Sequence, residues 1–367
     1  MCVPISAATP EQIRERVGIY IWGNVPDLSA AVDDARNTGA DHVVRAFIGP
    51  WSDTPPYHDD VRPLAEKVSD AGYQKMFREY QVIMLTAYDS YSYRSEYGAA
   101  DSLSELQDRS ETFEVRDRPN AGKIEQPSLG IARHLAQMSG KESREYLHRV
   151  KAEFAEFTYA LARHDRTFIL SNWEAENDVP DAGYWPWFHG YLQARLDGIL
   201  EGRARALRAR LPGRIFTAFE FTIIPEFAGR PSGLMMLGRN LRGVDYMSYS
   251  SWWSIGSGFD AQTMQSSFRE ALRRIRDHVS NTQRLIIGEF GEYWNEHPDA
   301  RRLRAIVDVA LDEHVEYLFN WVLYDQPGEL DDHGRDASHF GKFTQKRGLT
   351  PQGRAMRRWI AGAESVR

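Results

Sequence analysis

The chain has 367 residues, and its 45 basic residues are outnumbered by 52 acidic ones, which gives a formal net charge of −7. This balance argues against a nucleic-acid-binding protein, because phosphate binding needs clustered Lys and Arg. Hydrophobic residues make up 42% of the chain, enough to bury a large core, so a disordered chain is excluded. The single cysteine, Cys2, has no partner for an internal disulfide, which excludes a disulfide-stapled fold.

The N-terminal segment shows neither the basic region nor the apolar run of about 7–15 residues that a secretory signal needs. No stretch of the sequence approaches the ~18 apolar residues of a membrane span. We therefore expect a cytoplasmic protein without a membrane anchor. A secreted protein whose export signal has been removed is the alternative.

Short apolar runs rich in β-branched residues alternate eight times with longer segments of helical spacing. The predicted strands are Val17–Gly23, His42–Gly49, Gln81–Tyr88, Thr167–Glu174, Arg214–Thr222, Val244–Trp252, Arg284–Phe290 and Glu316–Leu323. The clearest predicted helices are Asp27–Thr38, Ser143–Arg163, Trp187–Leu211, Met264–Val279, Ala300–Glu313 and one that opens at Pro351.

Apolar strands that alternate with helices indicate a parallel sheet covered on both faces. Eight repeats over residues 1–367 predict that this sheet closes into an α/β fold of the (β/α)8 TIM-barrel type, forming a single catalytic domain. An open doubly wound sheet is the alternative fold. It is disfavoured because Gly23-Asn24-Val25-Pro26 follows the first strand, where a dinucleotide-binding fold carries G-x-G-x-x-G.

A long irregular stretch, residues 89–141, separates the third predicted strand from its helix. In a barrel such an insertion rises from the catalytic face, where the loops after the strands build the site. We expect this insertion to act as a lid or a wall that sets specificity. The alternative is a mobile decoration without a role in catalysis.

Two predicted strands end in a carboxylate. Glu174 closes the fourth strand in FILSNWE, and Glu289 closes the seventh in LIIGEF. Burying a carboxylate at the end of an apolar run is costly, so such a residue is expected to pair with another charged group or to serve in a functional site. Because these strands lie nearly opposite each other in a barrel, the pattern predicts a pair of carboxylates across a cleft, as glycoside hydrolysis requires.

FILSNWE, LIIGEFG and FNWVLYD at the fourth, seventh and eighth strands together resemble clan A glycoside hydrolases, closest to family 5. The resemblance implies a retaining β-glycosidase that acts on a carbohydrate or glycoside without a cofactor. It implies that Glu289 is the nucleophile and the fourth-strand glutamate the acid/base. It also implies that Arg45 supports the nucleophile and that Trp321 forms the floor under the sugar.

The fourth strand departs from this family, in which the acid/base directly follows an asparagine. Here Trp173 stands between Asn172 and Glu174. If the strand continues, alternation places Asn172, Glu174 and Glu176 on one face. We favour Glu174 as the acid/base, with Glu176 and Asp178 as alternatives. The resemblance implies that Asn172 binds the sugar 2-hydroxyl.

Two further strand residues are candidates. Tyr249 on the sixth strand is the nearest match to the family residue that holds the nucleophile. Glu220 lies inside the fifth strand, where it either contacts a ligand or pairs with an arginine of the barrel.

Two other classes of function are weighed against a glycosidase. A metal-dependent barrel is disfavoured, because no H-x-H or H-E-x-x-H motif is present and the strand ends carry Glu, Asn, Trp and Tyr. A carbohydrate-binding pseudo-glycosidase without turnover is the second hypothesis, motivated by the altered fourth strand.

Overall fold

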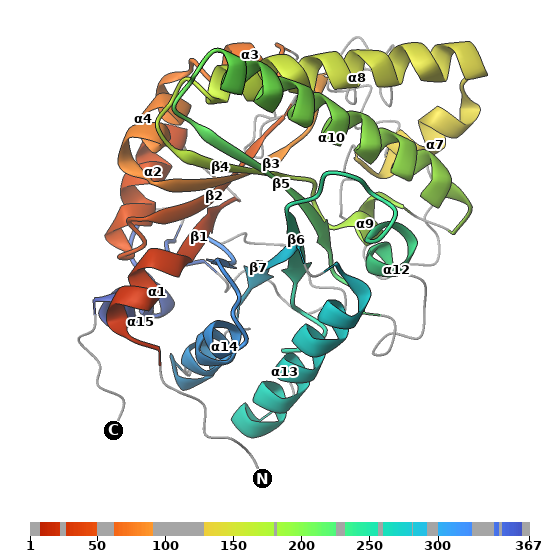
Figure 1. Ribbon diagram of the computed structural model, residues 1–367. Helices are drawn as coiled ribbons and strands as arrows, with labels where there is room; N and C mark the ends of the chain where they lie inside the picture. The colour runs from red at the N-terminus through yellow and green to blue at the C-terminus, as the bar shows by residue number, and fades with distance from the viewer. Residues whose placement is uncertain are drawn as a thin grey trace, which may run out of the picture.

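The computed structural model describes residues 8–22, 27–49, 62–90, 128–179, 182–224, 232–255, 260–280, 282–291, 300–324, 341–344 and 347–361. Eight parallel strands form a closed barrel in chain order, with β1 pairing both β2 and β8 (Figure 1). The predicted TIM barrel is therefore confirmed. The strands are β1 (Val17–Ile21), β2 (Val43–Ile48), β3 (Val82–Ala87), β4 (Thr167–Ser171), β5 (Arg214–Phe221), β6 (Tyr246–Ser250), β7 (Arg284–Phe290) and β8 (Leu318–Asn320).

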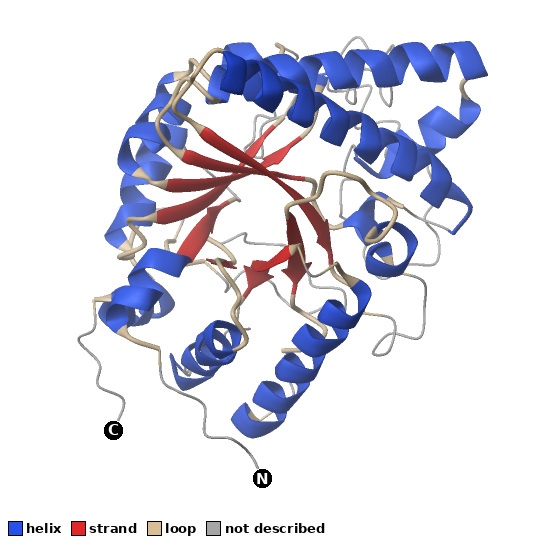
Figure 2. Cartoon of the chain, viewed as in Figure 1, coloured by secondary structure: helices blue, strands red, loops and turns tan. Residues whose placement is uncertain are grey.

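Helices form the layer outside the barrel (Figure 2). The longest, α8 and α10, pack against each other across β3 to β5 in Figure 1. The described helices are α1 (Pro10–Arg16), α2 (Leu28–Asn37), α3 (Leu64–Lys67), α4 (Ala71–Glu79), α7 (Ser128–Gln137), α8 (Gly140–Leu161), α9 (Ala175–Asp178), α10 (Trp185–Arg208), α12 (Gly233–Leu237), α13 (Ala261–His278), α14 (Ala300–Asp312) and α15 (Pro351–Ile360), with a 3₁₀ turn at Ala182–Tyr184.

Side-chain caps fix where several helices begin. Ser139 and Glu142 form a capping box at α8, in which each side chain accepts the backbone N–H of the other residue. Asp260 caps α13, and Thr350 caps α15 directly before Pro351. These caps satisfy N–H groups that have no partner inside the helix.

The lumen of the barrel changes character along its axis. Its N-terminal part is filled by an apolar cluster. Toward the C-terminal ends of the strands the inward side chains become polar, including the fully buried Arg45, Thr86 and Glu220. The apolar cluster consists of Val43, Val82, Met84, Ile169, Ala218, Tyr246, Ile286 and Phe319. Desolvated polar groups therefore gather at the end where barrel enzymes carry their sites.

The fourth strand is shorter than expected. It ends at Ser171, and the chain turns into helix α9 from Ala175 to Asp178. The expectation that Asn172, Glu174 and Glu176 share one strand face is therefore wrong. Strand alternation stops at the strand end, and the three side chains point to different surroundings.

Strand β7 carries one extra residue relative to both neighbours. Against β6, Tyr249 pairs with Ile287 and Ser250 with Glu289, so Gly288 has no opposite residue. Against β8 the register also shifts between Ile287 and Phe290. This arrangement is a β-bulge, which changes the direction of the side chains that follow it.

Part of the insertion predicted at residues 89–141 lies outside the described residues, namely 91–127. Its described C-terminal part forms α7 and the start of α8, and α7 packs against α9 and α10 (Figure 1). The expected lid or wall stays a prediction. Among the described helices, none combines the length and the apolar character needed to cross a membrane.

Candidate active site

Glu289, near the end of β7, points into the polar part of the lumen and is 3% exposed. Its Oε2 accepts hydrogen bonds from the Ser250 hydroxyl at 3.3 Å and from the Trp252 indole N–H at 3.2 Å. Its Oε1 has no hydrogen-bond partner among the described residues, and the Arg45 guanidinium lies 3.7 Å from it. One oxygen is thus fixed by neutral donors, and the other faces a cation.

Arg45, on β2, is held in place by a second carboxylate. Its Nη2 and Nη1 donate to Glu220 Oε1 and Oε2 at 2.7 and 2.8 Å, and Nη1 also donates to the Gly288 carbonyl at 2.8 Å. The guanidinium lies 4.2 Å from the centre of the Tyr20 ring. Of the two readings of Glu220, the structure shows the ion pair with a barrel arginine.

Glu174 lies just beyond β4 and is buried. Its carboxylate and that of Glu289 interact electrostatically, and both interact with the Ser250 hydroxyl. The structure therefore brings Glu174, Glu289 and Arg45 to one place at the mouth of the barrel.

The two carboxylates differ in acidity. Burial raises the pKa of Glu289 to about 7, although Arg45 and the donors from Trp252 and Ser250 oppose the rise. Burial and the nearby Glu289 charge raise the pKa of Glu174 well above its ordinary value. Because each negative charge disfavours the other, one of the two carboxylates can keep its proton while the other is ionised, which is the division of roles that acid-assisted displacement needs.

Glu176 occupies different surroundings. Its oxygens accept backbone N–H bonds from Thr222 at 2.8 Å, Gly233 at 2.7 Å and Ile223 at 3.3 Å. It therefore joins α9 to the end of β5 and to the start of α12. Burial raises its pKa, and these backbone bonds oppose the rise. The geometry favours Glu174 over Glu176 as a proton donor, and the side chain of Asp178 lies outside the described residues.

Asn172 and Tyr249 also have protein partners. The Asn172 amide group donates to the carbonyls of Trp173 and Glu220, and its oxygen accepts the Glu220 N–H at 3.0 Å. Both amide hydrogens are used, so Asn172 joins β4 to β5. Tyr249 points out of the lumen, with its ring stacked 5.6 Å from Phe221 and its hydroxyl 3.1 Å from Ser254. The structure does not bring the Tyr249 hydroxyl to Glu289.

Trp321 follows β8 and lies at the mouth beside the polar lumen. Its ring packs edge-on against Tyr20, with ring centres 5.2 Å apart, and lies 6.1 Å from the Trp22 ring. The Trp22 ring in turn contacts Phe47 at 5.5 Å. Aromatic faces at a mouth are suited to the apolar faces of sugar rings.

Ser250 and Trp252, the donors that hold Glu289, were not predicted from the sequence to contact it. The signal was the run Ser248-Tyr249-Ser250-Ser251-Trp252, since small polar residues at the end of a buried strand line a barrel mouth. Sequence reasoning also missed Arg195 on α10, whose Nη2 donates to the carbonyls of Ala87 and Ser171 at 2.7 and 3.0 Å. This contact fixes the ends of β3 and β4.

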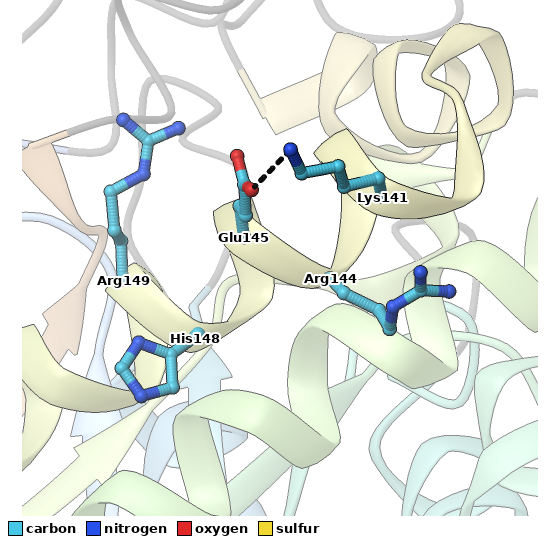
Figure 3. A pocket seen from close by; sticks show the side chains of 5 residues that line it. All are labelled: Lys141, Arg144, Glu145, His148 and Arg149. Atoms are coloured by element: carbon cyan, nitrogen blue, oxygen red, sulfur yellow. Dashed lines mark ion pairs between the residues drawn. The ribbon is translucent and has the colours of Figure 1, made fainter.

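A surface hollow elsewhere has no link to these carboxylates. Five exposed side chains line it, and Figure 3 shows that they project from one stretch of α8. The Lys141 ammonium and the Glu145 carboxylate are 3.8 Å apart. The lining residues are Lys141, Arg144, Glu145, His148 and Arg149. Within the described ranges, no three His, Cys, Asp or Glu side chains are grouped to hold a metal ion.

No protein-family model matches the sequence, and no curated protein matches it. Solved structures match the fold. GH5_18 from Streptomyces cattleya in complex with GlcNAc has a TM-score of 0.55 at 16% identity, and the alignment covers 96% of this chain and 82% of that one. GH5_18 from Bifidobacterium longum subsp. longum has a TM-score of 0.57 at 14% identity, with 96% and 80% covered.

Exo-beta-1,4-mannosidase Op5Man5 from Opitutaceae bacterium strain TAV5 has a TM-score of 0.58 at 15% identity. That alignment covers 95% of this chain and 59% of the mannosidase. At these identities the likeness establishes the fold. The chain thus has the TIM-barrel fold that these glycoside hydrolases share.

Proposed function

We propose that this protein is a retaining β-glycosidase that hydrolyses an O-glycosidic bond by double displacement. Glu289 is the nucleophile and Glu174 the acid/base. The observation that carries the proposal is the meeting of these two buried carboxylates at the Ser250 hydroxyl, beside the Arg45 cation and the Trp252 indole N–H. Glycosidases of this class use two such carboxylates from opposite sides of the cleft.

In the first step, an oxygen of ionised Glu289 forms a bond to the anomeric carbon while the bond from that carbon to the leaving oxygen breaks. Glu174 gives its proton to the leaving oxygen. The Ser250 and Trp252 donors hold Glu289 Oε2 and leave Oε1, which lacks a hydrogen-bond partner among the described residues, to attack. The product is a glycosyl ester of Glu289, with Glu174 now ionised.

In the second step, Glu174 takes a proton from water, whose oxygen attacks the anomeric carbon and displaces Glu289. Both carboxylates return to their starting protonation states. The two side chains supply nucleophile, acid and base, so this chemistry calls for no cofactor.

The experiment that tests this proposal is intact-protein mass spectrometry after incubation with activated 2-fluoro β-glycosides. The panel includes β-mannosides and β-glucuronides, because structural neighbours are named as a mannosidase and a β-glucuronidase. We expect the wild type to gain the mass of one fluorosugar. Glu174→Gln still gains it, because the activated leaving group needs no acid, whereas Glu289→Gln does not.

An adduct that persists in Glu289→Gln would overturn the assignment of the nucleophile. Sugar binding without any adduct or turnover would favour the pseudo-glycosidase instead. The mass of the adduct also reports which sugar class reacted.

A further inference from the structure

Arg45 is shared unequally between two carboxylates. Glu220 receives two short hydrogen bonds from the guanidinium, at 2.7 and 2.8 Å, whereas the closest Glu289 oxygen lies 3.7 Å away. Ser248 reinforces this preference by donating to Glu220 Oε2 at 2.6 Å. The Arg45 and Glu220 side chains are fully buried, so water does not screen them.

We propose that Glu220 is a positioning residue of the candidate active site: by binding Arg45 through both oxygens, it keeps the guanidinium beyond hydrogen-bond distance of Glu289, so that the hydrogen bonds to this carboxylate come from neutral donors. This inference rests on the proposed function, because it concerns the protonation of the proposed nucleophile. Glu220 acts through Arg45 and is not itself in contact with the substrate.

The charges around Glu289 support this role. The titratable and charged groups of the described chain that face it are Tyr20 from β1, Arg45 from β2, Glu174 after β4 and Glu220 from β5. Arg45 lowers the pKa of Glu289 and Glu220 raises it, so the two charges act in opposite directions, with the effect of Arg45 the larger. Strand β6 contributes the neutral Ser250, which donates to Glu289.

Two variants separate this role from a merely structural one. Glu220→Gln removes the competing carboxylate, so Arg45 becomes free to pair with Glu289. The double variant Arg45→Met with Glu220→Met removes the opposing charges together, and buried ion pairs are often replaced by apolar side chains without loss of stability. The double variant keeps the test decisive if Glu220→Gln does not fold.

The readout is the indole N–H resonance of Trp252, which donates to Glu289 Oε2 and therefore reports its ionisation. The protein is labelled with ¹⁵N at its ten tryptophans and titrated with pH, and the Trp252 signal is assigned by its loss in Trp252→Phe. In Glu220→Gln the midpoint is expected to fall by about one pH unit or more, a tenfold change in the ionisation ratio. In the double variant it stays within about half a unit of wild type, because opposing charges leave together.

Asp245→Asn is the matched control. It removes a carboxylate from an ion pair with Arg203 at the opposite end of the barrel and should leave the Trp252 midpoint unchanged. An unchanged midpoint in folded Glu220→Gln would overturn the proposal. So would a rise of a full unit in the double variant, which would mean that Arg45 serves Glu289 directly and Glu220 is a bystander.

The titration does not depend on turnover, so its outcome is separate from that of the adduct experiment. Where wild type turns over, the acidic limb of kcat/KM is measured as well and is expected to move with the Trp252 midpoint. A midpoint that shifts while no adduct forms with any sugar would support the Glu220 role and reject the glycosidase. An adduct without a shift of the Trp252 midpoint would support the glycosidase and reject the Glu220 role.

Discussion

Glu174 and Glu176 are two residues apart, yet their surroundings suit them to different tasks. Glu174 faces Glu289 and the Ser250 hydroxyl, whereas the Glu176 oxygens accept three backbone N–H bonds. A carboxylate whose oxygens already accept backbone hydrogen bonds is poorly placed to pass a proton to a substrate. A carboxylate kept protonated by burial beside another acid is well placed to do so.

Glu174→Gln should therefore lose activity according to the leaving group. On an alkyl glycoside we expect kcat to fall by about 10²- to 10⁴-fold, the usual contribution of general acid catalysis. On a dinitrophenyl glycoside formation of the glycosyl-enzyme should be nearly unaffected, which a pre-steady-state burst measures. Equal losses on both substrates would contradict the assignment. Glu176→Gln is the matched control and should show no dependence on the leaving group.

The pH dependence of activity follows from the same pair. Glu289 must be ionised, and its pKa is raised to about 7 by burial, so kcat/KM should rise with pH up to about 7. It should fall again when Glu174 loses its proton, and the pKa of Glu174 is raised well above its ordinary value by burial and by Glu289. Rates on an alkyl glycoside, whose leaving group needs the acid, measure both limbs between pH 4 and 10. A maximum at pH 5 or below would contradict this order.

Carboxylates buried side by side in this way oppose folding. Glu174 is buried beside a second carboxylate, so folding must either desolvate its charge or protonate it, and a neutral amide avoids this cost. We expect Glu174→Gln to raise the melting temperature, while Glu176→Ala lowers it because three backbone N–H groups lose their acceptor. Differential scanning calorimetry at pH 8 measures both. Destabilisation by both variants would show that Glu174 is structural.

At the scale of elements, the bulge in β7 sets the geometry of the lumen. A Cβ built on Gly288 would lie 1.8 Å from Glu220 Oε2 and 2.8 Å from Arg45 Nη1. The position after the bulged residue, Glu289, also faces the lumen. In a regular strand two successive side chains point to opposite faces, so only the extra residue lets both positions face inward.

Gly288→Ala should therefore separate the Arg45–Glu220 pair. We expect a loss of several kcal/mol of unfolding free energy or failure to fold, because a methyl group would displace buried ionic groups. Urea unfolding measures the loss. Gly140→Ala, at the first turn of α8, is the matched control, since its Cβ would meet only Arg144 Nη1 at 3.5 Å. Similar stability of the two variants would contradict the crowding described for Gly288.

Much of the element order could be predicted, because strands buried on both faces are nearly continuous apolar runs in the sequence. The ends of elements could not be predicted equally well. The strand predicted to reach Glu174 stops at Ser171, since the polar run Asn172 to Asp178 carries no signal for where α9 begins. Alternation then placed Asn172 and Glu176 in the lumen, where they do not lie.

The site was predictable to the same extent. Glu289 and Arg45 are charged residues embedded in apolar runs. Such a residue is expected to pair with an opposite charge or to belong to a functional site. The donors Ser250 and Trp252 depend on the register between β6 and β7, and a register shift is not visible in either strand alone. Because this shift is not visible in the sequence, the sequence favours Tyr249 as the residue that holds Glu289, whereas Ser250 and Trp252 do so in the structure.

At the scale of the whole molecule, buried acids make stability depend on pH. Burial raises the pKa of Glu153, on α8, to about 7, and Asp89 adds to the rise, while backbone and side-chain donors at Leu64 and Ser90 oppose it. A raised pKa means that the folded state binds the proton more tightly than the unfolded chain. The stability from this group is fully present below about pH 4.5 and is lost as pH rises through about 7.

The unfolding free energy should therefore fall between pH 5 and 8. Between its unfolded and folded pKa values, each group that is protonated only in the folded state contributes about 1.4 kcal/mol per pH unit. Chemical unfolding at several pH values measures the slope. Glu153→Gln should flatten it by one group, whereas Glu142→Gln, in the exposed cap of the same helix, should give a curve parallel to wild type. A Glu153→Gln curve parallel to wild type would contradict the assignment.

The extra residue in β7 also separates two properties that a substitution normally changes together. Exchanging Glu289 for another side chain alters the chemistry at this position. Where the position lies in the lumen is fixed by the number of residues between Ile287 and Phe290. A point mutation therefore changes which side chain lies opposite Glu174, but it does not change where that side chain lies. Moving it requires the deletion of a residue, which would turn position 289 toward the helices. Laboratory evolution by substitution alone should thus vary the reactivity of residue 289 while the register of β7 against its neighbours stays the same.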